Sequence, residues 1–150
     1  MAGFYLLQTP RAGKTEAPVG RDPKRQVAAA SLSCRVQKAD AAIDRVRAIC
    51  LALPETSERL SHGTPHFFAG KKNFVAYWNN HHEDGRHCIW CAAPEGAQRM
   101  MVEADPEHFF VPPYVGFRGW LGVHLDRGME WDEIAGVIET AHRTVTAKRR

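Results

Sequence analysis

Apolar residues recur at helical spacing in three stretches of this chain. The clearest pattern runs from about Glu130 to Thr146, where one apolar stripe predicts an amphipathic helix. A second helix is predicted to start at Asp40, a residue type that caps helix N-termini, and to end at Pro54. A third, shorter helix is predicted after residues 94–96. Its inward face would consist of Ala97, Met100, Met101 and Ala104.

Between these helices, short apolar stretches bounded by turn residues predict strands. The strands are expected at residues 56–61, 65–69, 73–78, 87–92 and 119–125. Gly70-Lys71-Lys72 would form a tight hairpin between the second and third strands, and residues 79–86 a polar loop with a turn at Asp84-Gly85. We expect His108, Phe109 and Phe110 to lie in a turn.

The order helix, antiparallel strands, helix, strand, helix predicts an α+β fold in two layers, with the helices covering one face of a sheet. A chain of 150 residues is long enough for one domain with a real core, and we place this domain at residues 39–150. Residues 1–38 show no sustained hydrophobic period and are predicted to be a disordered basic extension. A transit-like segment is the alternative for this stretch.

The formal charge of +3 is unevenly distributed along the chain. Residues 1–39 contain seven basic and two acidic residues, whereas residues 40–150 contain 13 basic and 15 acidic residues. The predicted domain is therefore mildly acidic, and the pI of about 8.8 is a weak argument for a nucleic-acid partner.

Several features indicate a cytoplasmic protein that is not attached to a membrane. No apolar run approaches the roughly 18 residues that span a bilayer, and Met1–Leu7 lacks the basic flank of a signal peptide. Four cysteines without a secretion signal are typical of reduced thiols in the cytosol. We expect a monomer.

A cysteine pair and a histidine cluster are the candidates for a metal or cofactor site, and neither pattern supports such a site. Cys88 and Cys91 fall in a predicted strand, where their separation of three points the side chains to opposite faces. A zinc site would also need a second pair of ligands. His81, His82 and His87 belong to a polar hairpin that solvation alone explains. We expect no metal and no cofactor.

The chain also contains an aromatic loop, residues 112–120. Its two prolines exclude a helix start or a central strand, and Gly116 and Gly119 permit unusual backbone conformations. Tyr114, Phe117 and Trp120 add large apolar surfaces. Loops of this composition often form binding surfaces.

Four motifs have an order and spacing that resemble the MmcQ/YjbR-like family over residues 42–147: H-G-x-P-x-F from His62, G-K-x-x-F from Gly70, C-x-x-P from Cys91 and P-P-Y-V-G-x-x-G-W from Pro112. The resemblance implies a small α+β fold with frataxin-like architecture. It also implies DNA binding through two projecting wings, which would be the hairpin at residues 70–72 and the loop with Arg118. The acidic domain departs from a typical DNA-binding protein.

The leading hypothesis is therefore a non-enzymatic module that binds DNA weakly and without sequence preference. Lys71, Lys72 and Arg118 would neutralise phosphates, with Phe117 or Tyr114 against a sugar or base. The alternative for Arg118 is an ion pair with Asp126 or Glu107.

A second hypothesis is a ligand-binding or enzymatic cleft for a small anionic molecule, lined by His62, His66, Tyr114 and Trp120. Catalysis would require a nucleophile or carboxylate partner, for which Ser61, Thr64, Glu55 and Glu58 are candidates, but no triad or elbow motif surrounds them. A structural role is the simpler explanation for these four residues. The two histidines would hydrogen-bond the backbone of a turn, and the two aromatic residues would anchor the loop. A third hypothesis is a protein-interaction adaptor that docks its partner on the aromatic loop.

Overall fold

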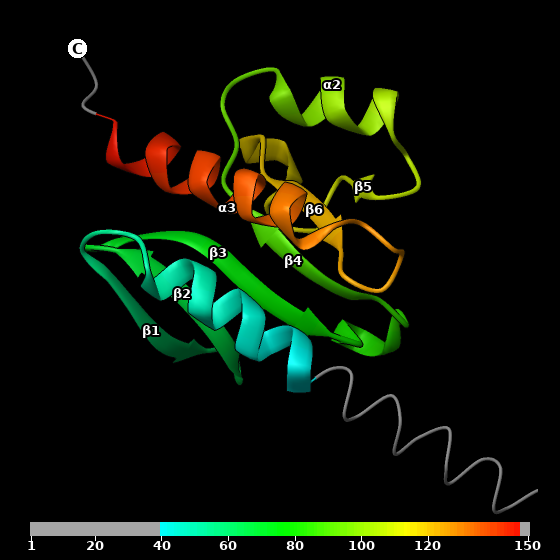
Figure 1. Ribbon diagram of the computed structural model, residues 1–150. Helices are drawn as coiled ribbons and strands as arrows, with labels where there is room; N and C mark the ends of the chain where they lie inside the picture. Colours follow the sequence, from blue (N-terminus) through cyan, green and yellow to red (C-terminus); the bar gives the residue numbers. More distant parts are fainter. Residues whose placement is uncertain (1–39, 148–150) are drawn as a thin grey trace, which may run out of the picture. The chain divides into compact units, whose positions relative to one another are not determined.

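The strands form one six-stranded antiparallel sheet in the order β1-β2-β3-β4-β6-β5. The computed structural model describes residues 40–147, so the predictions for residues 1–38 lie outside the described part (Figure 1). The strands are β1 (Thr56–Ser61), β2 (Thr64–Ala69), β3 (Lys72–Asn79), β4 (His87–Cys91), β5 (Phe109–Phe110) and β6 (Leu121–His124). The helices are a first helix over residues 40–51, α2 (Ala97–Ala104), α3 (Trp131–Thr146) and the 3-10 turns η1 (His81–Glu83) and η2 (Gly116–Arg118). In this part of the chain, no helix combines the length and the apolar character that crossing a membrane requires.

The predicted α+β architecture is confirmed, and most strand boundaries agree within two residues. The prediction of a turn at Phe109 and Phe110 is wrong. These residues form β5, which pairs with Val123 and Gly122 of β6 because this pairing buries Phe109 in the core. The last strand begins at Leu121 because Gly119 has a φ of 82° and ends η2.

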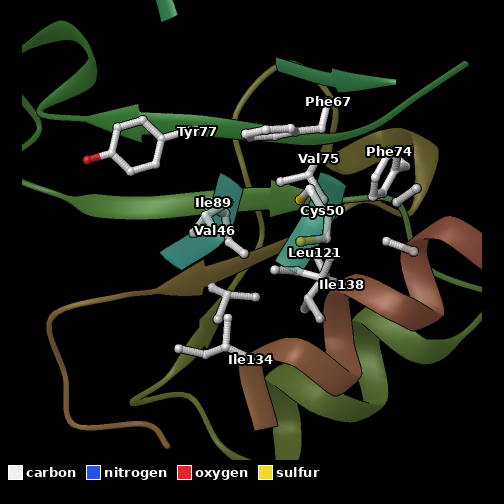
Figure 2. Packing of buried hydrophobic residues seen from close by; sticks show 14 of the residues in the cluster. Val46, Cys50, Phe67, Phe74, Val75, Tyr77, Ile89, Leu121, Ile134 and Ile138 are labelled. Atoms are coloured by element: carbon white, nitrogen blue, oxygen red, sulfur yellow. The ribbon is translucent and has the colours of Figure 1, made fainter. Parts of the chain in front are cut away.

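The main core lies between the sheet and the helices. Alternate residues of the central strands point toward it. Tyr77 of β3 and Ile89 of β4 belong to one buried cluster with Val46 of helix 40–51 and Ile138 of α3 (Figure 2). Figure 1 shows helix 40–51 and α3 on the same side of the sheet. We call this side the helix-covered face.

A β-bulge at Phe74 changes which face of the sheet the first residues of β3 point to. Phe67 of β2 pairs with Val75, whereas the next residue, Phe68, pairs with Asn73, which leaves Phe74 as an extra residue. Phe74 and Val75 can therefore both lie in the main core, where each is fully buried. Asn73 consequently shares the opposite face with Ala76 and Trp78.

That opposite face is also apolar, but loops rather than helices cover it. Its buried cluster consists of Ala76, Trp78, Cys88 and Trp90, against which Phe110, Val115 and Trp120 pack. We call it the loop-covered face. Cys88 lies here while Cys91 lies in the main core, which confirms that the two thiols point to opposite sides.

Gly122 is the residue that allows Phe110 to lie flat on this face. A Cβ atom at position 122 would fall 2.5–2.6 Å from three atoms of the Phe110 ring. That ring cannot retreat easily, because it stacks on His124 at 4.6 Å and under the Arg86 guanidinium at 4.6 Å.

We therefore expect Gly122→Ala to lower the free energy of unfolding by about 1–3 kcal/mol, the usual cost of overpacking. The measurement is urea denaturation followed by circular dichroism. In a Phe110→Ala background the same substitution should cost much less, since the ring is gone. An equal cost in both backgrounds would show that the Phe110 ring is not the obstacle.

Candidate functional site

The loop-covered face contains a cavity of about 470 Å³. Strands β2, β3 and β4 supply its floor, with His66, Trp78 and Trp90, while the β1–β2 turn, η1 and the aromatic loop form its walls. The lining residues are Ser61, His62, His66, Asn73, Ala76, Trp78, His81, His82, Trp90, Tyr114, Val115, Arg118 and Trp120.

The cavity brings together residues from two of the sequence-based hypotheses. All four residues predicted to form a cleft, His62, His66, Tyr114 and Trp120, line it. Arg118, predicted to contact phosphates, lines the same cavity. The aromatic loop and the first hairpin turn are more than 40 residues apart in sequence, and only the sheet places them side by side.

The two lysines of the predicted nucleic-acid site lie elsewhere. Lys72 donates a hydrogen bond from Nζ to the carbonyl of Val145, 2.8 Å away at the C-terminal end of α3, which packs on the helix-covered face. Lys71 is exposed in the β2–β3 hairpin turn. The structure therefore does not gather Lys72 and Arg118 into one phosphate-binding surface.

The cavity wall has a positive electrostatic character. Arg118 is its one permanently charged residue, and no carboxylate lines it among the described residues. None of the ion pairs within residues 40–147 involves Arg118, so the alternative pairing with Asp126 or Glu107 is not formed. Its guanidinium instead lies over the Phe117 ring, 5.4 Å from the ring centroid.

Three polar atoms on the cavity floor have unused hydrogen-bonding capacity. They are the buried indole Nε1 atoms of Trp78 and Trp90 and the buried Oδ1 atom of Asn73. In the described part of the protein, Trp78 Nε1 and Asn73 Oδ1 have no partner, and Trp90 Nε1 has only the weakly accepting thiol of Cys88. Leaving such an atom unpaired costs about 1–3 kcal/mol, so each one calls for an explanation. All three belong to residues that line the cavity.

Burial lowers the pKa of two histidines that line the cavity, His66 on the floor and His81 in the wall. Desolvation lowers the pKa of His66, which favours the neutral ring near pH 7. Its Nδ1 lies 3.1 Å from the carbonyl oxygen of Thr64. In the neutral ring, Nδ1–H donates to this carbonyl and Nε2 is left as an acceptor. Desolvation, followed by the neighbouring His82, also lowers the pKa of His81.

The site offers little for covalent chemistry. Ser61 Oγ lies 3.0 Å from His62 Nδ1, but this contact joins adjacent, exposed residues, and no carboxylate is bonded to that ring in the described structure. Within residues 40–147, no group of three histidine, cysteine or acidic side chains is arranged to hold a metal ion.

Backbone strain is concentrated around the cavity. Six non-glycine residues of the described part have positive φ, and three of them, His62 (54°), His82 (51°) and Tyr114 (64°), line the cavity. Such conformations cost about 1–3 kcal/mol each and tend to cluster at functional sites. Gln98 of α2 holds the aromatic loop by donating from Nε2 to the carbonyls of Gly116 and Trp120.

Several lining residues were missed by sequence analysis. Trp78 and Trp90 could have been found, since alternation along two strands places them on the face opposite Tyr77 and Ile89. His81 and His82 were considered only as metal ligands. Asn73 could not have been placed, because its position depends on the bulge at Phe74.

Comparisons with known proteins agree with this architecture. A model of the YjbR family matches residues 51–144, which is more than half of the chain. The fold is similar to the crystal structure of Deinococcus radiodurans protein DR2400, whose title carries the domain name DUF419. The TM-score is 0.59 at 17% sequence identity, covering 71% of this chain and 79% of that one. No curated protein matches.

The positive φ of His82 predicts that a glycine at this position stabilises the fold. Glycine adopts positive φ without a Cβ penalty, so His82→Gly should raise the free energy of unfolding by about 0.5–1 kcal/mol despite its entropic cost. Urea denaturation measures the change. The matched control is His81→Gly, because the neighbouring residue is not among those with positive φ and should lose stability. A loss of stability in both variants would contradict the strain.

Proposed function

This chain belongs to the YjbR family, and we propose that it is a non-enzymatic binding protein that holds a small anionic ligand in the cavity of its loop-covered face. The observation that carries the proposal is the position of Arg118, an arginine without a carboxylate partner on a wall that contains no acidic residue among those described. An anion entering this cavity would gain a charge-assisted hydrogen bond. A cation would find no counter-charge there.

The rest of the wall suits a ligand that also has an apolar, flat part. Trp78, Trp90 and Trp120 supply aromatic surface on which a flat group can pack. A volume of about 470 Å³ lies within the range of small-molecule sites, which is roughly 300–1,000 Å³.

A matched set of probes tests this proposal. We expect phenyl phosphate to raise the thermal unfolding midpoint of the full-length chain, and benzylamine, a cation with the same ring, to have no effect. A ligand at about 100 times its Kd adds about 2.7 kcal/mol to the free energy of unfolding, which is several degrees for a domain of this size. Differential scanning fluorimetry measures the shift.

Arg118→Gln should abolish the stabilisation by phenyl phosphate. The control is Arg99→Gln, which removes an exposed arginine of α2 that pairs with Glu103 outside the cavity. The proposal fails if benzylamine stabilises as well as phenyl phosphate, or if Arg118→Gln responds like the wild type.

Weak nucleic-acid binding is the second candidate, and the exposure of the aromatic loop favours it. Phe117 is 82% exposed and Tyr114 70% exposed, beside Arg118. Exposed aromatic rings next to a cation are typical of proteins that stack the bases of single strands. Lys71 would add one phosphate contact, whereas Lys72 would have to release the carbonyl of Val145.

Fluorescence anisotropy with a labelled single strand and a duplex of the same sequence tests this candidate. Binding should weaken as salt rises, and Phe117→Ala should weaken single-strand binding more than duplex binding, since only unpaired bases stack freely. Arg99→Gln again serves as the control. Absence of salt-sensitive binding to either probe at low ionic strength rejects the candidate.

A further inference from the structure

The buried polar atoms on the cavity floor restrict the chemistry of the ligand more narrowly than the charge of Arg118 does. Trp78 and Trp90 are each 5% exposed. In the described structure the indole N–H of Trp78 has no partner, and that of Trp90 has only the weakly accepting thiol of Cys88. Their rings lie 4.7 Å apart between centroids, so the two donors belong to one aromatic pair. An acceptor atom of a ligand would satisfy a buried donor that otherwise costs stability.

The same floor also presents acceptors. The Oδ1 atom of Asn73 is buried and unpaired, and the bulge at Phe74 places this residue on the cavity side. His66 is 5% exposed, and its Nδ1 is engaged by the carbonyl of Thr64, which leaves Nε2 as an acceptor in the neutral ring. The residues of the cavity floor therefore include both hydrogen-bond donors and hydrogen-bond acceptors.

Aromatic rings surround this polar floor. His81 lies 4.0 Å from the Trp78 ring and 5.4 Å from the Trp90 ring, and Tyr114 lies 6.4 Å from His81. These surfaces favour a flat ligand. A plain hydrocarbon ring would leave the floor's donors and acceptors unpaired, whereas a heterocycle with both kinds of group on its edge would pair them.

Building on the proposed function, we propose that the ligand is a planar heterocycle bearing one acidic group, the class that nucleoside monophosphates represent. The ring edge hydrogen-bonds Trp78, Trp90, Asn73 and His66, and the acidic group bonds Arg118. Such a nucleotide is available either as a free monophosphate or at the end of a single strand, and the chemistry of recognition is the same.

Isothermal titration of the full chain with five probes tests this assignment: UMP, AMP, phenyl phosphate, uridine and a 5′-phosphorylated oligonucleotide. At least one monophosphate should bind about ten-fold more tightly than phenyl phosphate, the difference expected from a buried hydrogen bond. Uridine, without the phosphate, should bind more weakly than UMP. A 5′-phosphorylated oligonucleotide that binds more tightly than both monophosphates identifies a strand end as the source.

Trp78→Phe and Trp90→Phe remove an indole N–H but keep an aromatic ring. Each should weaken binding of the preferred monophosphate about ten-fold and change phenyl phosphate binding by less than about two-fold. Trp131→Phe is the control, because Trp131 lies at the start of α3 and outside the cavity. Circular dichroism checks that each variant is folded.

The outcomes separate the two proposals. If phenyl phosphate binds through Arg118 as tightly as the monophosphates, the heterocycle assignment is overturned and the anion site stands. Equal losses for both ligands in Trp78→Phe and Trp90→Phe also overturn the assignment, since they indicate packing rather than hydrogen bonding. If no acidic probe binds, the proposed function itself is wrong.

Discussion

Strands β3 and β4 carry large apolar side chains on both faces, yet the long helices cover only one of them. On the helix-covered face, helix 40–51 and α3 close the core around residues such as Val75 and Ile89. On the other face, Trp78 and Trp90 must be shielded by whatever the connecting loops provide. These loops leave a cavity over the two indole rings. The cavity is the result of this asymmetry.

The loops that cover this face are held in place at some energetic cost. Gln98 bonds the middle and the C-terminal end of the aromatic loop, at Gly116 and Trp120. Positive φ angles occur at His62, His82 and Tyr114 in the segments that surround the cavity. Arg118, Trp78 and Trp90 line the same cavity. Positive φ angles, buried polar side-chain atoms and a cation without a carboxylate partner therefore coincide in residues that line one cavity.

The sequence predicted what local pattern controls. Helical stripes and strand alternation located nearly every element, and the separation of Cys88 from Cys91 followed from strand geometry alone. Pairing between distant residues could not be predicted from local patterns. Strand β5 exists because Phe109 pairs with Val123, and Asn73 changes face because of a bulge. The bond from Lys72 to the carbonyl of Val145 joins residues 73 positions apart, which no local pattern reveals.

The most direct test of this account uses the chain's four tryptophans as reporters. Three of them, Trp78, Trp90 and Trp120, line the cavity, and Trp131 lies outside it. In ¹H–¹⁵N spectra of the full chain titrated with phenyl phosphate, the account predicts that the indole signals of Trp78 and Trp90 shift while that of Trp131 stays in place. Unchanged signals, or equal shifts at all four tryptophans, would contradict a ligand site on the loop-covered face.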